Sequence, residues 1–157
     1  MMRPMSHSLP GSLPENAGVL RYLGEGADPA DVPVERPTAT TDRWHLGAHP
    51  DIVERLWTDL AGPLPDGSQR LIAGGAALVD PSTGLVLAVA LGTRYALRLD
   101  GDGLREARAR GYVSLHEFTT VGRTLDLEAT FGPGWVFGRH EADEGPWLAS
   151  GLAERTG

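Results

Sequence analysis

The side chains able to carry out acid–base chemistry lie mainly in the C-terminal half of the chain. His116 and Glu117 are adjacent, Asp126 follows on the next predicted segment, and His140 stands in the polar stretch RHEADE, residues 139–144. Histidine and carboxylate groups transfer protons near neutral pH when a fold brings them within hydrogen-bonding distance. If these four residues surround one cleft, the chain is a small enzyme or a ligand-binding domain.

Each of these residues also has an explanation that involves no catalysis. His116 and Glu117 would occupy successive positions of a strand, so their side chains would point to opposite faces and could not chelate one ion. The acidic residues of 139–144 precede a predicted helix, where they stabilise its N-terminus by capping and by interacting with the helix dipole. An enzyme is therefore the less favoured of the two interpretations of the sequence.

Metal and cofactor chemistry has little support in the sequence. His45 and His49 have the spacing of a helical metal-binding pair, but Gly47 and Pro50 place both in a loop before a helix. The chain has no cysteine, which removes thiolate nucleophiles and cysteine metal ligands. It also has no lysine, so a Walker-type phosphate loop and a lysine Schiff base are excluded. We therefore predict no metal and no cofactor.

The charge of the chain bears on its partners. All 14 basic residues are arginine, which together with many Ala, Gly and Pro residues is typical of a GC-rich bacterial genome. The formal net charge of −7 disfavours binding to nucleic acid or to an anionic membrane, and mildly favours a basic partner. The sequence contains neither a leader-like apolar stretch near its start nor a run long enough to cross a bilayer. These features predict a cytoplasmic protein.

A second group of candidate residues could bind another protein. Arg94 and Arg98 would share one face of a strand about 13 Å apart, at about 3.3 Å per residue, and could each hold a carboxylate of the partner. Tyr95, together with exposed tryptophan, would mark an interface. Alternatively, the arginines cover a solvated face with their stems or pair with local acids.

Four short apolar segments separated by turn residues predict an antiparallel meander. Pro81 and Gly84 suit a hairpin turn, and Gly92 is the first residue of a two-residue loop, as a type II′ turn requires. Before them, the stretch from Pro50 to Leu60 predicts a helix with apolar residues at intervals of three and four. The four strand segments are QRLIAG (69–74), AALVD (76–80), LVLAVAL (85–91) and RYALRLD (94–100).

The segment 85–91 is apolar at every position, which predicts a strand buried on both faces. Simple alternation would put Leu85, Leu87, Val89 and Leu91 on one face, and would turn the shallower face, made of Val86, Ala88 and Ala90, towards the 50–60 helix. The next segment alternates between large apolar and polar or small residues, which predicts a strand nearer the edge.

The remaining segments are assigned by the same signals. Residues 104–111 predict a short helix closed by Gly111, and 143–155 predict a closing helix. Strands or extended segments are predicted within 112–121, 125–129 and 135–138.

The chain as a whole predicts one α+β domain, residues 43–157, with a four- to six-stranded antiparallel meander and two or three helices mainly on one face. Residues 1–42 are rich in Pro and Gly and predict a disordered tail, with Val19–Leu23 resting on the domain or docking on another protein. The favoured function is a noncatalytic protein-interaction module of the immunity, adaptor or accessory type, and self-association into a homo-oligomer stays open.

Overall fold

The computed structural model describes residues 13–38, 48–118 and 122–138. The helical elements are η3 (Pro14–Asn16), α1 (Ala17–Leu23), η4 (Pro29–Asp31), α2 (Pro50–Glu54), η6 (Arg55–Leu60), α3 (Gly101–Ala109) and α4 (Leu127–Thr130). The strands are β1 (Val34–Glu35), β2 (Gln69–Ile72), β3 (Gly75–Val79), β4 (Val86–Leu91), β5 (Arg94–Arg98), β6 (Leu115–Phe118), β7 (Arg123–Asp126) and β8 (Trp135–Gly138).

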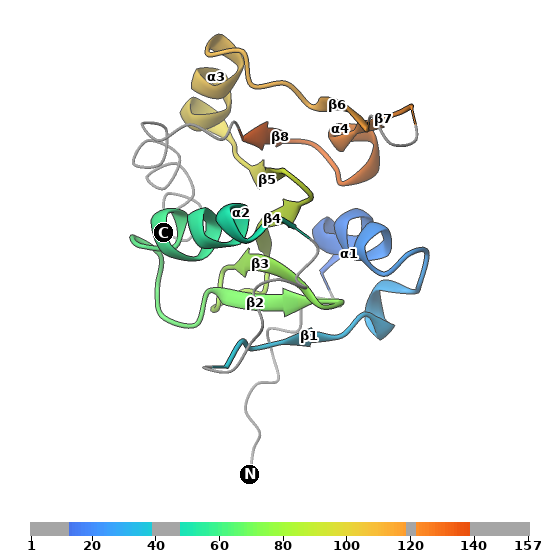
Figure 1. Cartoon of the computed structure of the whole chain (residues 1–157), viewed down its shortest axis with the longest axis vertical. Helices are drawn as coiled ribbons and strands as arrows, with labels where there is room; N and C mark the ends of the chain where they lie inside the picture. The colour runs from blue at the N-terminus through green and yellow to red at the C-terminus, as the bar shows by residue number, and fades with distance from the viewer. Residues whose placement is uncertain (1–12, 39–47, 119–121, 139–157) are drawn as a thin grey trace.

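A six-stranded antiparallel sheet in the order β1-β2-β3-β4-β5-β8 forms the centre of the molecule. Strands β1 to β5 follow one another as a meander, and β8 completes the sheet beside β5 (Figure 1). Strands β6 and β7 form a separate hairpin that lies near β8. The predicted α+β class and the antiparallel meander are confirmed.

Helices contribute to both faces of the sheet. The continuous helix formed by α2 and η6 packs on one face, together with Ala107 of α3, while α1 and α4 pack on the other. The two longer helical segments therefore share a face, as predicted, and two shorter helices cover the opposite face. Buried apolar side chains fill the space on either side of the sheet, so that it is sheltered front and back.

Strand β4 has the predicted two-sided burial but not the predicted alternation. Ala88 and Ala90 join the core cluster of the 50–60 helix, as expected from their small size. A register shift between Leu78 and Val79 leaves Leu87 as an extra residue on β4. This bulge turns Leu87 towards the same helix and leaves Val86 on the opposite face with Val89, so the predicted alternation is wrong at both residues.

The turns between strands follow their sequence signals. Gly84 and Gly92 adopt φ angles of 84° and 60°, and Thr93 keeps an ordinary negative φ, as expected for a type II′ turn. In the turn between β3 and β4, the Asp80 carboxylate accepts hydrogen bonds from the backbone N–H and the hydroxyl of Ser82, at 2.9 and 2.8 Å. These local bonds fix the chain reversals that position the meander.

The helix that begins at Pro50 is capped at one end and widened at the other. His49 accepts a hydrogen bond from the backbone N–H of Asp51 through Nδ1 at 3.1 Å, so this histidine is a capping residue. From Arg55 the α-helix widens into a π-helical segment that ends at Leu60. The indole of Trp57 donates to the carbonyl oxygen of Ala77 on β3 at 3.0 Å, which ties this helix to the sheet.

The N-terminal part of the described chain belongs to the fold. Val19 and Leu20 of α1 have no exposed surface, and β1 pairs with β2. The buried Asn16 donates to the carbonyl oxygen of Gly84 and accepts from the N–H of Val86, both at 2.9 Å. The predicted disorder is therefore wrong for residues 13–38, whereas residues 1–12 and 39–42 lie outside the described ranges.

The C-terminal half differs from prediction at one place. The predicted helix ending at Gly111 and the strand 135–138 are confirmed, and β6 occupies part of 112–121. The segment 125–129, expected to be a strand, is strand only to Asp126, whose carboxylate caps the N-terminus of α4. The predicted helix 143–155 lies beyond the described residues. None of the helices described here combines the length and apolarity that crossing a bilayer requires.

Candidate functional site

The three described members of the acid–base group do not converge. In the β6–β7 hairpin His116 pairs with Leu125, whereas Glu117 pairs with Thr124 and Leu115 with Asp126. Alternation therefore puts His116 on the inner face and both carboxylates on the outer face. The His116 ring packs on Phe137 of β8, with 5.0 Å between ring centroids.

The surroundings of these groups indicate structural roles. Burial, and then the positive charge of Arg94, lower the pKa of His116 below its ordinary value, which favours the neutral ring. The Asp126 carboxylate accepts a hydrogen bond from the N–H of Ala129 at 3.2 Å. Within the described ranges, no three His, Asp or Glu residues are placed to hold a metal ion. His45 and His140 lie outside these ranges.

Two of the three residues predicted to bind a partner are buried. Arg98 is 5% exposed, and the side chain of Tyr95 has no exposed surface. Arg98 donates to the carbonyl oxygen of Val86 at 2.9 Å and to Asn16 Oδ1 at 3.2 Å, and its guanidinium lies 5.0 Å from the ring centroid of Trp135. Arg98 and Tyr95 are therefore not accessible to a partner in this structure, as the predicted binding role of each would require.

The outer side of the β6–β7 hairpin carries a different accessible surface, which we call the hairpin face. Its apolar part consists of Val113 and Leu115, which are 57% and 53% exposed. The carboxylates of Glu117 and Asp126 lie exposed on the same side of the hairpin as Leu115. The hairpin face thus combines large apolar side chains with negative charge.

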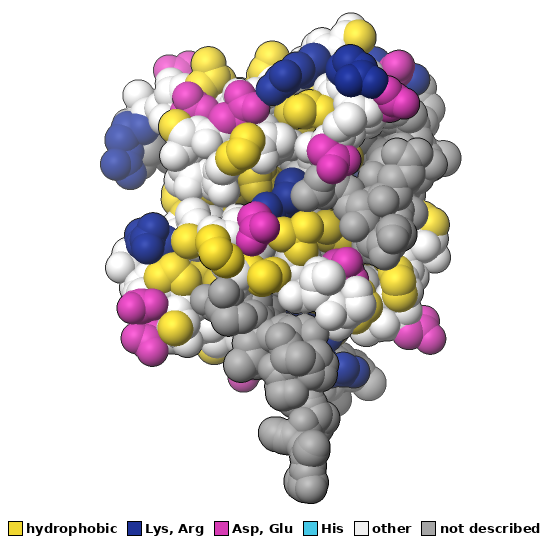
Figure 2. Space-filling model, turned by 180° about the vertical axis from the view of Figure 1, so that it is seen from behind, with side chains coloured by type: hydrophobic (Ala, Val, Ile, Leu, Met, Phe, Trp, Pro, Cys, Tyr) yellow, Lys and Arg dark blue, Asp and Glu magenta, His cyan; other side chains and the backbone are white. Residues whose placement is uncertain are grey.

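A groove of about 370 Å³ runs beside Val113 and Leu115. The buried Tyr112 and Val136 contribute to its lining. At its rim Arg108 donates to the Glu128 carboxylate at 2.8 Å. Elsewhere, the back of the molecule shows hydrophobic, acidic and arginine side chains interleaved rather than one large basic patch (Figure 2).

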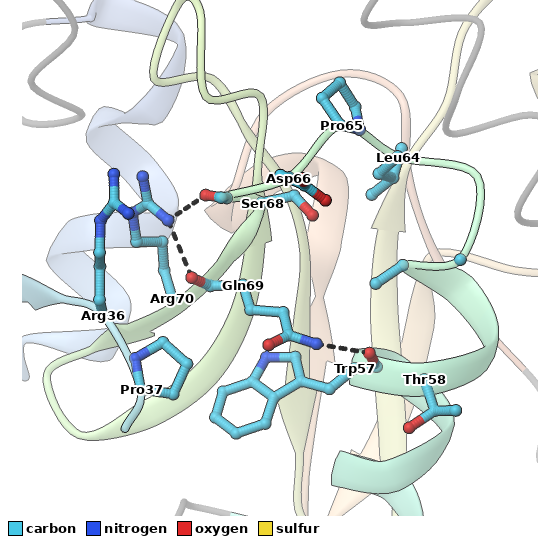
Figure 3. Close-up of a pocket in the computed structure, with 13 residues that line it drawn as sticks. Arg36, Pro37, Trp57, Thr58, Leu64, Pro65, Asp66, Ser68, Gln69 and Arg70 are labelled. Atoms are coloured by element: carbon cyan, nitrogen blue, oxygen red, sulfur yellow. Dashed lines mark hydrogen bonds between the residues drawn. The ribbon is translucent and has the colours of Figure 1, made fainter. Parts of the chain in front are cut away.

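A second site, which we call the arginine pocket, lies between β2 and the 50–60 helix and has a volume of about 490 Å³ (Figure 3). Arg36 and Arg70 stand side by side on one wall. Arg70 Nη1 donates to the carbonyl oxygens of Gly67 and Gln69, the latter at 2.9 Å. Trp57 and Gln69 lie between this wall and the helix, where the Gln69 amide donates to the Trp57 carbonyl oxygen at 2.7 Å.

The wall of the arginine pocket formed by Arg36 and Arg70 carries two positive charges without a paired carboxylate from the described chain. Burial, and then the adjacent charge of Arg36, lower the pKa of Arg70, although a guanidinium stays protonated at neutral pH. Across the described part of the chain neither arginine forms an ion pair with a carboxylate. Asp66 also lines the pocket, but its carboxylate points away from the two guanidinium groups (Figure 3).

Sequence reasoning missed the arginine pocket because its two arginines meet through one short strand pairing. Val34 pairs with Ile72 and Glu35 with Leu71, which brings the next residue, Arg36, opposite Arg70. Arg36 lies in the segment whose composition predicts a disordered tail, and no signal in the sequence places it near a strand.

Comparison of the chain with known protein families, with curated proteins and with solved structures gave no match.

Proposed function

We propose that the chain is a noncatalytic protein-interaction module of the immunity, adaptor or accessory type, acting in the cytoplasm of a bacterium. Its hairpin face binds a segment of the partner that carries both apolar and basic side chains. The observation that carries this proposal is the exposure of Val113 and Leu115 by more than half, where both line one groove and Leu115 shares its face of the hairpin with Glu117 and Asp126.

The energetics of the hairpin face favour a partner of this kind. Each Å² of apolar surface removed from water contributes roughly 25 cal/mol, so covering Val113 and Leu115 stabilises a complex. The carboxylates at their side attract basic residues, which increases the association rate and fixes the orientation of the partner. The net charge of −7 acts in the same direction at longer range.

The opposite placement of the acid–base groups supports binding over catalysis. A general base and a general acid must reach the same substrate atoms. His116 packs inside the hairpin while Glu117 and Asp126 lie on its outer side. Carboxylates that face outward beside exposed leucine and valine suit recognition of a basic segment.

A capture experiment with charge-changing variants tests the proposal. The full chain, immobilised, is expected to recover one stoichiometric protein from bacterial lysate, with cross-links from a basic and apolar segment to residues 113–117. Leu115→Asp and Glu117→Arg should each reduce recovery at least tenfold without lowering the unfolding temperature. Asp31→Arg, a charge reversal next to β1 at the far edge of the sheet, is the matched control and should not change it.

Two results would contradict the proposal. One is equal recovery by the wild type, Leu115→Asp and Glu117→Arg. The other is a partner whose cross-linked segment is acidic, since Glu117 and Asp126 would repel it.

A further inference from the structure

We propose that the arginine pocket binds a small organic molecule through its carboxylate, with the guanidinium groups of Arg36 and Arg70 as the recognition elements. The observation behind this is a pair of adjacent cations on the wall of a cavity, with no carboxylate of the described chain to neutralise them. This site is separate from the hairpin face, and its function does not depend on the protein-interaction proposal.

The two arginines differ in how firmly they are held. Arg70 is half-buried, and its Nη1 is fixed by the carbonyl oxygens of Gly67 and Gln69, which leaves Nε and Nη2 as donors for a ligand. Arg36 is exposed and makes no hydrogen bond within the described residues, so its side chain can adjust to a ligand. A guanidinium offers parallel N–H donors that match the two oxygens of a carboxylate.

Electrostatic repulsion makes this pair of arginines a site for an anion. Two like charges side by side destabilise each other, and the interaction grows as burial lowers the effective dielectric constant. A bound carboxylate neutralises the pair and gains charge-assisted hydrogen bonds. The pocket is therefore preorganised on the Arg70 side, and ligand binding removes an unfavourable interaction already present in the protein.

The rest of the pocket fits a small molecule with an apolar body. Its volume of about 490 Å³ falls within the range of roughly 300 to 1,000 Å³ that is typical of small-molecule sites. Trp57, Leu64 and Pro65 line it opposite or beneath the arginine wall (Figure 3). These side chains can contact an aromatic or aliphatic group while the carboxylate lies against the arginines.

Asp66 makes a carboxylate a better ligand than phosphate. Its side chain lines the same pocket and adds a negative charge to the site. A phosphate group carries up to two negative charges at neutral pH, so Asp66 repels it more strongly than it repels a carboxylate with one. Among the described residues, the charged side chains that line the pocket are Arg36, Arg70 and Asp66, and their net charge of +1 suits a ligand with a single negative charge.

The test is a titration of the full, isotopically labelled chain with three probes, followed by NMR. Phenylacetate is expected to shift the indole N–H signal of Trp57 and the side-chain amide signals of Gln69 in a saturable manner. Phenylacetamide has the same shape without the charge, and it should bind at least tenfold more weakly. Inorganic phosphate should also bind more weakly than phenylacetate.

Variants of the two arginines separate recognition from folding. Arg36→Gln should weaken phenylacetate binding about tenfold without lowering the unfolding temperature, because Arg36 bonds to nothing in the described chain. Arg70→Gln should weaken it at least as much. Arg21→Gln removes an exposed arginine from α1 and is the matched control.

Three outcomes would overturn the inference. Equal binding of phenylacetate and phenylacetamide would remove the role of charge, and tighter binding of phosphate would assign the pocket to a phosphate ligand. Unchanged binding of phenylacetate by Arg36→Gln would show that the arginine pair does not recognise it. Capture of a protein through the hairpin face is measured independently and is unaffected by any of these results.

Discussion

Two buried polar residues, Asn16 and Arg98, connect the N-terminal part of the described chain to the central sheet. Arg98 looks like a surface residue in the sequence because it alternates with buried apolar positions. In the structure Arg98 is buried. Its N–H groups donate hydrogen bonds to Asn16 and to the carbonyl oxygen of Val86, and its positive charge lies over the face of the Trp135 ring. Asn16 in turn bonds to the start of β4. A buried arginine of this kind requires partners from distant segments, which alternation within one strand cannot reveal.

His116 gives the folding stability a specific dependence on pH. Its pKa is lowered in the folded protein, first by burial and then by Arg94, so the unfolded chain takes up a proton at a higher pH. The stabilising effect of the neutral ring is complete above its ordinary pKa of about 6.5 and is lost as the pH falls from there to the folded pKa. The free energy of unfolding, measured with urea, should therefore decrease between pH 7.5 and 5.5.

The contribution of His116 to this decrease is isolated with His116→Gln, which cannot take up the proton. The variant is expected to show a smaller loss of unfolding free energy over the same pH interval, because it lacks the proton uptake by His116. Parallel pH profiles of the wild type and of His116→Gln would be incompatible with the lowered pKa.

At the scale of elements, local signals predicted those strands that alternate or end in clear turns. The apolar run of β4 predicted burial on both faces, but an apolar residue at every position cannot specify the register of a strand. The bulge at Leu87 is therefore a product of tertiary packing against the 50–60 helix. Similarly, the apolar pattern of 125–129 predicts a strand, although an Asp followed by Leu, Glu and Ala also fits a helix N-terminus, which is what Asp126 forms.

The candidate sites were predictable only in part. Glu117 and Asp126 were recognised as chemically notable, but their exposure beside Val113 and Leu115 depends on which face of β6 packs on β8. Helix α1 is too short to show a period of 3.6, and β1 has two residues, so neither could be distinguished from a Pro- and Gly-rich tail. The arginine pocket depends on the pairing of β1 with β2, so it could not be predicted from the sequence.

The pairing of β5 with β8 depends on the absence of a side chain at Gly138. Gly138 lies opposite Tyr95, and a Cβ atom added there would meet Tyr95 Cδ2 at 2.6 Å and Cζ at 2.7 Å. Tyr95 has no exposed surface and cannot move into solvent. Gly138→Ala should lower the free energy of unfolding by about 1 to 3 kcal/mol, as overpacking does in buried sites, in urea denaturation.

Gly62→Ala is the matched control for this substitution. A Cβ atom at Gly62 meets backbone oxygens only at 3.5 and 3.6 Å, which is ordinary van der Waals contact. This variant is expected to change the free energy of unfolding by less than about 0.5 kcal/mol, or to stabilise slightly by restricting the unfolded chain. Equal effects of the two substitutions would show that the contact with Tyr95 carries no energetic weight.

At the scale of the whole molecule, the sheet is stable only when both of its faces are covered. The 50–60 helix covers one face, and residues from the N-terminal segment, α4 and the hairpin cover the other. Val19 and Leu20 of α1 share their core cluster with Val89 of β4, Ala96 of β5 and Phe137 of β8. We therefore expect residues 13–38 to unfold together with the meander.

This cooperativity can be measured with a truncation in α1. Leu20 has no exposed surface, so Leu20→Ala should lower the free energy of unfolding by about 2 to 5 kcal/mol, as for other buried leucines. Arg21→Ala, at the exposed neighbouring position, should stay within about 0.5 kcal/mol of the wild type. Because α1 and the sheet unfold together, circular dichroism and tryptophan fluorescence should report one coincident transition for Leu20→Ala, shifted to lower urea. If α1 were merely resting on a self-sufficient sheet, Leu20→Ala would leave the main transition in place and cause only a small early loss of helical signal.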